Sequence, residues 1–231
     1  MLPGAVTGEL LGRAGADFVV VDLQHGATGE ADLPGVAAAI RTAGAVPLVR
    51  TRSPHFPDVG RALDLGAHGV VVPGVRDAEH AREVVAACRY APAGTRSIGR
   101  LSGGAERPLV IVMVETASAL ADLDDLLTVD GIDGVYVGPG DLGLAVELSG
   151  EEHRAELRAV LSSVVARAVA AGVPVGVHAS DAGEAASFAA EGATIVTVAA
   201  DAVALARAVR TSLGDVRANA SPRPLGAPPR L

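Results

Sequence analysis

Two carboxylates that follow apolar segments are the residues of this sequence best suited to metal chemistry. Glu115 comes directly after the apolar run 110–114, and Asp141 follows the apolar run 135–137 through the short turn 138–140. A carboxylate at the end of a buried strand is costly to desolvate without a partner, so two of them indicate a shared cation. Two oxygen ligands suit a hard divalent ion that keeps waters or takes a bidentate substrate. Alternatively, Asp141 caps the following helix and Glu115 pairs with a neighbouring arginine.

Two histidines, an arginine and a glycine turn could act beside such a centre. His25 would titrate near working pH and could serve as a general acid or base. Arg50 could be a fixed cation beside a developing oxyanion, and Gly138 and Gly140 bracket a turn whose backbone N–H groups could hold a carboxylate. His178 follows another apolar run and would join the same face. Each has a structural alternative: a satisfied histidine, an ion pair at the rim, or a tight turn.

The sequence contains no lysine, because all 19 basic residues are arginine. A Schiff-base enzyme, a pyridoxal-phosphate anchor and a phosphate-loop lysine each need a primary amine on a side chain, so these three chemistries are excluded.

The composition indicates one soluble, globular domain. The chain has 231 residues, of which 49% are hydrophobic and 20% charged, enough to bury a substantial core. The formal net charge of −8 argues against nucleic acid and anionic membranes as partners. The single cysteine, Cys88, excludes an intramolecular disulfide, and the N-terminus lacks the pattern of a signal peptide. We therefore expect a cytoplasmic protein.

Short β-branched runs alternate with longer stretches rich in Ala, Leu and Arg, which predicts the alternating strands and helices of a parallel α/β fold. The expected strands are residues 18–23, 46–49, 69–72, 109–114, 134–137, 173–177 and 195–198. The expected helices are residues 30–43, 58–65, 77–90, 118–128, 151–171, 182–191 and 202–213. Most strands are continuously apolar, which indicates a sheet buried on both faces.

A TIM (β/α)8 barrel that lacks its first strand is the architecture we favour, with an open doubly wound sheet as the alternative. Polar residues follow four of the expected strands, and a barrel brings the carboxyl ends of all strands to one face. We expect residues 1–214 to form this catalytic domain. Residues 215–231 are rich in proline and are expected to be a disordered tail.

Taken together, these features resemble the HpcH/HpaI aldolase family of metal-dependent (class II) pyruvate aldolases. This family includes 4-hydroxy-2-oxoheptanedioate and 2-keto-3-deoxy-sugar-acid aldolases. The similarity runs from about Gly8 to about Val209. The matching segments are residues 22–26, 47–50, 63–67, 71–73, 89–90, 94–96, 114–116 and 129–142, of which the last is the most specific.

The resemblance implies a metal site. Glu115 and Asp141 would hold a divalent cation, Mg²⁺ or Mn²⁺, with Co²⁺ and Zn²⁺ as further possibilities. Pyruvate would bind this ion through its keto and carboxylate oxygens. Its carboxylate would rest against the backbone of the turn formed by Gly138, Pro139, Gly140 and Asp141.

The resemblance also implies roles in proton transfer and substrate binding. Arg50, together with the metal, would stabilise the enolate, and His25 would move protons through water. Gln24, which stands where glutamate is common in the family, would contact the substrate. The family's histidine-orienting aspartate corresponds to Asp64, which our topology places at the opposite rim. Asp64 would then act across a subunit interface, and Asp22 is the alternative within the chain.

The implied reaction is the cleavage of a 4-hydroxy-2-oxo acid to pyruvate and an aldehyde. Decarboxylation of oxaloacetate is a close rival, because loss of CO₂ gives the same enolate. A citrate-lyase-like or malyl-thioester lyase would share the two-carboxylate site, and a truncated, inactive relative that acts as a binding or oligomer partner is the non-enzymatic hypothesis. Members of the family resemble one another in forming dimer-based hexamers. We therefore expect a homo-oligomer in which the helix 202–213 packs on a neighbour.

Overall fold

A parallel sheet of seven strands forms the centre of the structure. The computed structural model describes residues 2–99, 105–198 and 200–219, which fall into two compact units, 1–199 and 200–231. The strands all belong to the first unit and pair in sequence order. They are β1 (Phe18–Asp22), β2 (Val46–Arg50), β3 (Gly69–Val72), β4 (Leu109–Val114), β5 (Gly134–Val137), β6 (Val175–His178) and β7 (Ile195–Thr197). The predicted α/β class and its seven strands are confirmed.

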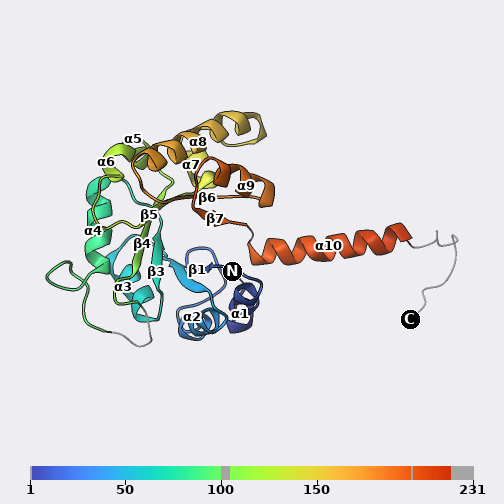
Figure 1. The fold of residues 1–231 in the computed structure, drawn as a ribbon, viewed down its shortest axis with the longest axis horizontal. Coiled ribbons are helices and arrows are strands. Elements are labelled where there is room, and N and C mark those ends of the chain that lie inside the picture. Colours follow the sequence, from blue (N-terminus) through green and yellow to red (C-terminus); the bar gives the residue numbers. More distant parts are fainter. Residues whose placement is uncertain (1, 100–104, 199, 220–231) are drawn as a thin grey trace. The chain divides into compact units, whose positions relative to one another are not determined.

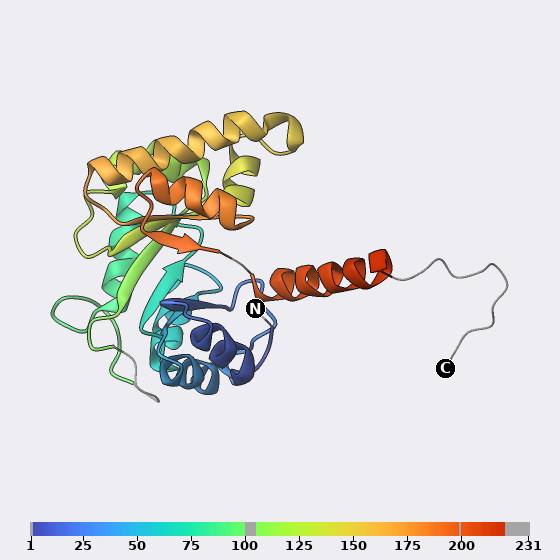
Figure 2. The same cartoon turned by 45° about the vertical axis from the view of Figure 1, so that its right-hand side comes forward.

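The sheet curls around an inner face, and helices cover its outer face (Figure 1 and Figure 2). The inner face carries a separate apolar cluster of Leu48, Val71, Ile111, Met113 and Tyr136. Other side chains from the same strands pack outward against the helices. Both faces are therefore buried, which explains why the strand sequences are almost continuously apolar. The curl and the strand order agree with a TIM-like barrel that lacks one strand.

Helices follow most strands, as predicted. Those of the first unit are α1 (Ala5–Arg13), α2 (Leu33–Thr42), α3 (Phe56–Asp64), α4 (Ala78–Cys88), α5 (Ala117–Ala121), α6 (Leu123–Leu126), α7 (Pro139–Ala145), the 3₁₀ helix η1 (Glu151–His153), α8 (Arg154–Ala170) and α9 (Ala182–Ala190). The single helix predicted over 118–128 is wrong, because α5 ends and α6 begins around Asp122. The Asp122 carboxylate there accepts a hydrogen bond of 2.7 Å from the backbone N–H of Ala78.

Helix α1 had no counterpart among the predicted elements. Its Gly8 and Gly12 are buried against α2, where a Cβ on Gly8 would lie 2.8 Å from the Ile40 side chain. A Cβ on Gly12 would lie 2.7 Å from that of Ala43. Glycine disfavours a helix on its own, so α1 owes its formation to this close packing of the two helices.

The described part of the second unit is α10 (Asp201–Asn219). This helix extends beyond the predicted range 202–213 and runs through residue 214, where we expected the barrel domain to end. The rest of the predicted tail, residues 220–231, lies outside the described residues. Within the described ranges, no helix has the combination of length and apolar sequence that crossing a bilayer requires.

Candidate functional site

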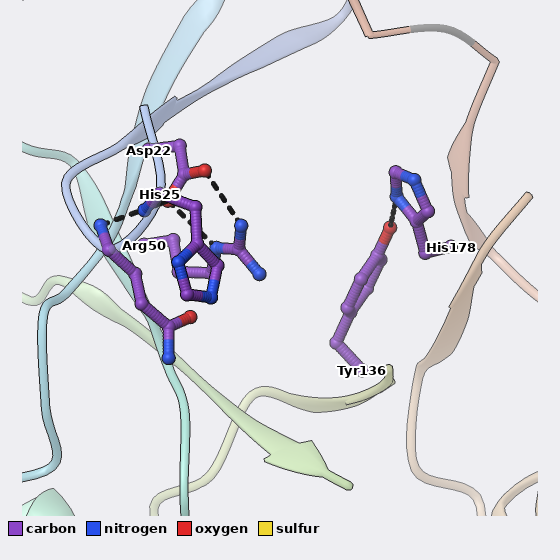
Figure 3. A network of polar contacts seen from close by, with 6 residues as sticks. Asp22, His25, Arg50, Tyr136 and His178 are labelled. Atoms are coloured by element: carbon purple, nitrogen blue, oxygen red, sulfur yellow. Dashed lines mark hydrogen bonds and ion pairs between the residues drawn. The ribbon is translucent and has the colours of Figure 1, made fainter. Parts of the chain in front are cut away.

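Asp22 and Arg50 form a bidentate ion pair at the carboxyl ends of β1 and β2. The strand register places the two residues side by side. Arg50 donates from Nε to Asp22 Oδ1 at 2.9 Å and from Nη2 to Oδ2 at 2.7 Å (Figure 3). Burial opposes the charge of Asp22, but Arg50 and two backbone N–H groups hold the pKa of this carboxyl below its usual value. The guanidinium is therefore fixed in one orientation before any substrate binds.

The loop after β1 is organised by the same carboxylate. Asp22 Oδ1 accepts hydrogen bonds from the backbone N–H groups of Gln24, at 3.0 Å, and His25, at 3.2 Å. Figure 3 places the His25 ring beside the Arg50 guanidinium. Asp22 thus holds His25 through its backbone, not through the imidazole. This backbone contact does not support the prediction that Asp22 orients the His25 ring.

Glu115 is a buried carboxylate with one unused oxygen. It follows β4, and the residue is only 6% exposed. Its Oε1 accepts a hydrogen bond of 2.7 Å from the backbone N–H of Gly74, whereas Oε2 is buried and has no partner among the described residues. Burial raises the pKa of Glu115, and so does Asp141, while Arg50 and His25 lower it. Asp141, Arg50 and His25 therefore each lie within electrostatic reach of Glu115.

The backbone of Gly138 packs closely against the unpaired oxygen. A Cβ on this residue would lie 2.9 Å from Glu115 Oε2 and 3.1 Å from Met113 Cε. Helix α7 begins directly after Gly138, and Asp141 lies in its first turn and is exposed. A buried carboxylate oxygen without a donor and a second carboxylate nearby together suit a cation better than a neutral ligand.

The number of protein ligands available to such a cation is small. The described part of the chain contains no group of three or more His, Cys, Asp or Glu side chains that could hold a metal ion. A cation shared by Glu115 and Asp141 would take water or substrate oxygens as its other ligands. Such an open site is typical of Mg²⁺ or Mn²⁺, whereas a structural metal site is closed by protein ligands. The rest of the predicted turn, Pro139 and Gly140, forms the start of α7 beside these carboxylates.

Asp64 lies away from this centre. It is the last residue of α3, which leads into the amino end of β3, opposite the end that carries Glu115. Its Oδ1 accepts a hydrogen bond of 2.8 Å from Arg96, whose side chain is only 2% exposed. Arg96 also stacks on the ring of Tyr90. Within this chain, Asp64 therefore holds a buried arginine, and its action at a site across a subunit interface stays a prediction.

A second polar group faces the Asp22–Arg50 pair. The Tyr136 hydroxyl hydrogen-bonds Thr197 Oγ1 at 2.8 Å and lies 3.4 Å from His178 Nδ1 (Figure 3). We call Tyr136, His178 and Thr197 the Tyr136 cluster. His178 does stand at the end of β6, as expected, but neither Tyr136 nor Thr197 was singled out from the sequence. The only signal was a tyrosine within an aliphatic strand, in a chain with two tyrosines.

The Gly138→Ala variant should be less stable than the parent by about 1–3 kcal/mol, because the new methyl group presses on Glu115 and Met113. Urea unfolding monitored by circular dichroism measures this difference. Gly35→Ala is the matched control, since a Cβ at that helical position meets nothing within 4 Å. It should be neutral or stabilising by up to about 1 kcal/mol. Equal effects of the two substitutions would show that position 138 is not crowded.

Known proteins share this fold and much of this sequence. The model of the HpcH/HpaI aldolase/citrate lyase family matches residues 6–208. Hydroxypyruvate/pyruvate aldolase from Rhizorhabdus wittichii is 36% identical over 230 residues, which are 94% of this chain and 92% of that protein. 4-Hydroxy-2-oxo-heptane-1,7-dioate aldolase from Salmonella dublin is 32% identical over 68% of this chain and 65% of its own length. The crystal structure of an HpcH/HpaI aldolase/citrate lyase family protein from Burkholderia cenocepacia superposes with a TM-score of 0.84 at 28% identity, covering 94% of this chain and 93% of that one.

Proposed function

Since the chain belongs to the HpcH/HpaI aldolase/citrate lyase family, we propose that it cleaves a 4-hydroxy-2-oxo acid to pyruvate and an aldehyde, and catalyses the reverse addition. The family and its named relatives make the chain an enzyme of the aldolase or lyase type. The observation that carries the specific reaction is the buried Glu115 carboxylate, whose Oε2 has no partner among the described residues and which lies within electrostatic reach of the fixed Arg50 guanidinium. We also propose that β1 to β7 are staves of a TIM barrel whose carboxyl end carries this site.

Glu115 and Asp141 are the residues that we expect to hold a divalent cation, Mg²⁺ or Mn²⁺. The unpaired Glu115 Oε2 and the electrostatic reach of Asp141 to Glu115 support this assignment. Burial is the main cause of the raised pKa of Glu115, and the negative charge of Asp141 adds to it; a cation would offset both effects. When bound, such a cation would neutralise negative charge that develops on the 2-oxo acid during the reaction.

The chain's own residues account for the bond changes. His25, acting directly or through a water, removes the proton from the C4 hydroxyl of the substrate. The C3–C4 bond then breaks as the C4–O double bond of the aldehyde forms, and the electron pair of the broken bond becomes the enolate of pyruvate. Arg50 stabilises the developing oxyanion with its positive charge. Its Nε and Nη2 groups donate to Asp22, which fixes the orientation of the guanidinium plane. Protonation of C3 completes pyruvate.

The same arrangement would support loss of CO₂ from oxaloacetate, because that reaction also yields the enolate of pyruvate. The electrostatic demands on Arg50 and Glu115 are the same in both reactions. Aldol cleavage additionally needs a base for the C4 hydroxyl, and the position of the His25 ring beside Arg50 favours that reaction (Figure 3).

The direct test of the proposed function is pyruvate release from a series of 4-hydroxy-2-oxo acids, followed with lactate dehydrogenase and NADH. We expect turnover with Mg²⁺ or Mn²⁺ and its loss after treatment with EDTA, with recovery on addition of the metal. Turnover of oxaloacetate alone would favour the decarboxylase. Full activity in EDTA would contradict the role given to Glu115 and Asp141.

We expect the protein to be a homo-oligomer, and sedimentation velocity checks this directly. Within its own unit, α10 exposes an apolar stripe of Leu205, Val209, Leu213 and Val216. Such a stripe needs cover from another surface. A dimer-based assembly such as a hexamer should sediment as one species at micromolar concentration. A stable monomer under these conditions would contradict the expectation.

A further inference from the structure

The Tyr136 cluster is a set of hydrogen-bonding groups that the proposed cleavage does not use. Its three side chains come from β5, β6 and β7, at the end of the sheet that carries Glu115. Figure 3 shows Tyr136 and His178 across from the Asp22–Arg50 pair, and His25 lies on the same side as that pair. Arg50 acts electrostatically on both the Tyr136 phenol and the His178 imidazole, so these groups share one site with the guanidinium.

The strands are shaped to hold the phenol in this place. Tyr136 pairs with Gly176 in the neighbouring strand, where a Cβ would lie 2.9 Å from the tyrosine ring and 2.2 Å from the Ile195 carbonyl oxygen. The absence of a side chain at Gly176 leaves the room that the ring occupies. The pairing of His178 with Thr197 then puts two polar side chains at the hydroxyl end of the ring.

The cluster has hydrogen-bonding capacity beyond its internal contacts. The Tyr136 ring is buried at 8% exposure and rests on the apolar inner cluster, but His178 is exposed and Thr197 half-buried. Two hydroxyl groups and two ring nitrogens make only two contacts among themselves. The remaining donors and acceptors are available to a ligand at the mouth of the sheet.

All three members of the cluster are uncharged at neutral pH. Burial raises the pKa of Tyr136 to about 12. Partial desolvation of the His178 ring and the Arg50 cation lower the pKa of this imidazole, which favours its neutral form. Uncharged donors and acceptors that are already placed suit a neutral hydroxyl group, and they penalise a methyl group, which would leave them unpaired.

We infer that the Tyr136 cluster binds a hydroxyl group of the aldehyde fragment and makes this enzyme select hydroxyaldehydes over alkyl aldehydes of the same size. This inference rests on the proposed function, because it assigns the second half of the same site. Glu115, Asp141 and Arg50 would engage the 2-oxo acid end of the substrate. The fragment beyond C4 would then extend toward the opposite side of the site, where Tyr136 and His178 lie (Figure 3).

Two aldehydes of equal heavy-atom number test the inference in the addition direction with pyruvate and Mg²⁺. Glycolaldehyde carries a hydroxyl group where propanal carries a methyl group, so their ratio of kcat/KM isolates that group. In Tyr136→Phe we expect the value for glycolaldehyde to fall about tenfold or more, and that for propanal to change less than about twofold. Thr197→Val, which is isosteric, should shift the ratio in the same direction.

The matched control is the chain's other tyrosine. Tyr90→Phe removes a hydroxyl group but keeps the ring that stacks on Arg96, so it should leave the ratio of the two aldehydes unchanged. Circular dichroism checks that each variant is folded, and Thr197→Val carries the test if Tyr136→Phe is not. Equal losses with both aldehydes, or an unchanged ratio in both cluster variants, would overturn the inference.

Exchange of the pyruvate methyl protons with D₂O separates this inference from the proposed function. The exchange needs no aldehyde, so in the parent protein it reports enolate formation independently of what the Tyr136 cluster binds. A parent protein that exchanges while the aldehyde ratio is insensitive to the cluster refutes the inference alone. A parent protein that shows no exchange refutes the proposed function, and the inference falls with it.

Discussion

The Glu115→Gln variant should lose about a thousandfold or more in kcat/KM for pyruvate release while remaining folded. The amide oxygen can still accept the hydrogen bond that Gly74 donates to Oε1. The charge with which Glu115 would hold a cation is gone. The coupled lactate dehydrogenase assay measures the loss. Activity within tenfold of the parent would contradict the place of Glu115 at the centre of the reaction.

Thermal unfolding of the same variant separates a lost ligand from a damaged fold. Burial raises the pKa of Glu115 above its ordinary 4.5, so folding favours the protonated form. The stability this group contributes at low pH is therefore lost as pH rises through the raised value. The neutral amide escapes that loss. Without divalent cations, Glu115→Gln should have a Tm equal to or above that of the parent at neutral pH, with the two converging toward pH 4.5.

Added Mn²⁺ or Mg²⁺ should reverse this order. A ligand that binds only the folded protein raises its Tm, and the parent should gain while Glu115→Gln should not. Asp141→Asn should behave like Glu115→Gln, with little gain in Tm from the metal. Equal gains in all three proteins would place the cation elsewhere.

Replacement of Arg50 is expected to have the next largest effect. Arg50→Ala should reduce kcat/KM for pyruvate release about a hundredfold or more, the usual scale for loss of one oxyanion-stabilising donor. Arg50→Lys should restore little of this, because an ammonium group cannot make the two parallel hydrogen bonds to Asp22. Steady-state kinetics with saturating metal make this comparison. Full activity of Arg50→Lys would show that charge alone is sufficient.

The Asp22 partner provides a graded comparison for Arg50. Asp22→Asn keeps the guanidinium but removes the charge that fixes it, so we expect an intermediate loss of about tenfold. The double variant Asp22→Asn/Arg50→Ala should be no slower than Arg50→Ala, since the two residues act as one unit. Arg82→Gln, which breaks only an exposed pair with Glu79, is the control and should leave kcat/KM unchanged.

The strands could be predicted from the sequence because the pattern that specifies them lies within a few consecutive residues. Runs such as residues 70–72 and 110–114 are buried on both faces. A short β-branched run that is bounded by glycine or proline predicts a strand and little else. Helix α1 could not be predicted in the same way. Its glycines are explained only by their contacts with Ile40, which lies in α2, and Ala43, which caps the end of that helix.

The site was predictable where one residue per strand end carried the signal. Glu115, His25, Arg50 and His178 all follow or end strands, and parallel pairing brings such positions to one end of the sheet. Contacts between strands were less accessible. The Tyr136 hydroxyl meets groups that are 42 and 61 residues away in sequence.

The role of Asp22 was also set by strand register. Asp22 was the alternative to Asp64 as the residue that orients His25, and the pairing of β1 with β2 brings its carboxylate to Arg50. A motif such as residues 22–26 therefore identifies which residues belong to the site more readily than it identifies the side chains that they bind.

Exchange of the pyruvate methyl protons with solvent, followed by NMR in D₂O, tests the central claim most directly. Enolate formation needs only the Glu115–Asp141 pair with its cation, Arg50 and a base, so no aldehyde has to be guessed. With Mg²⁺ or Mn²⁺ the methyl signal of pyruvate should decay at a rate proportional to enzyme concentration, and Glu115→Gln should show no decay above the enzyme-free rate. A metal-loaded, folded protein that left the pyruvate methyl signal unchanged would contradict the assignment of this chain as a pyruvate aldolase.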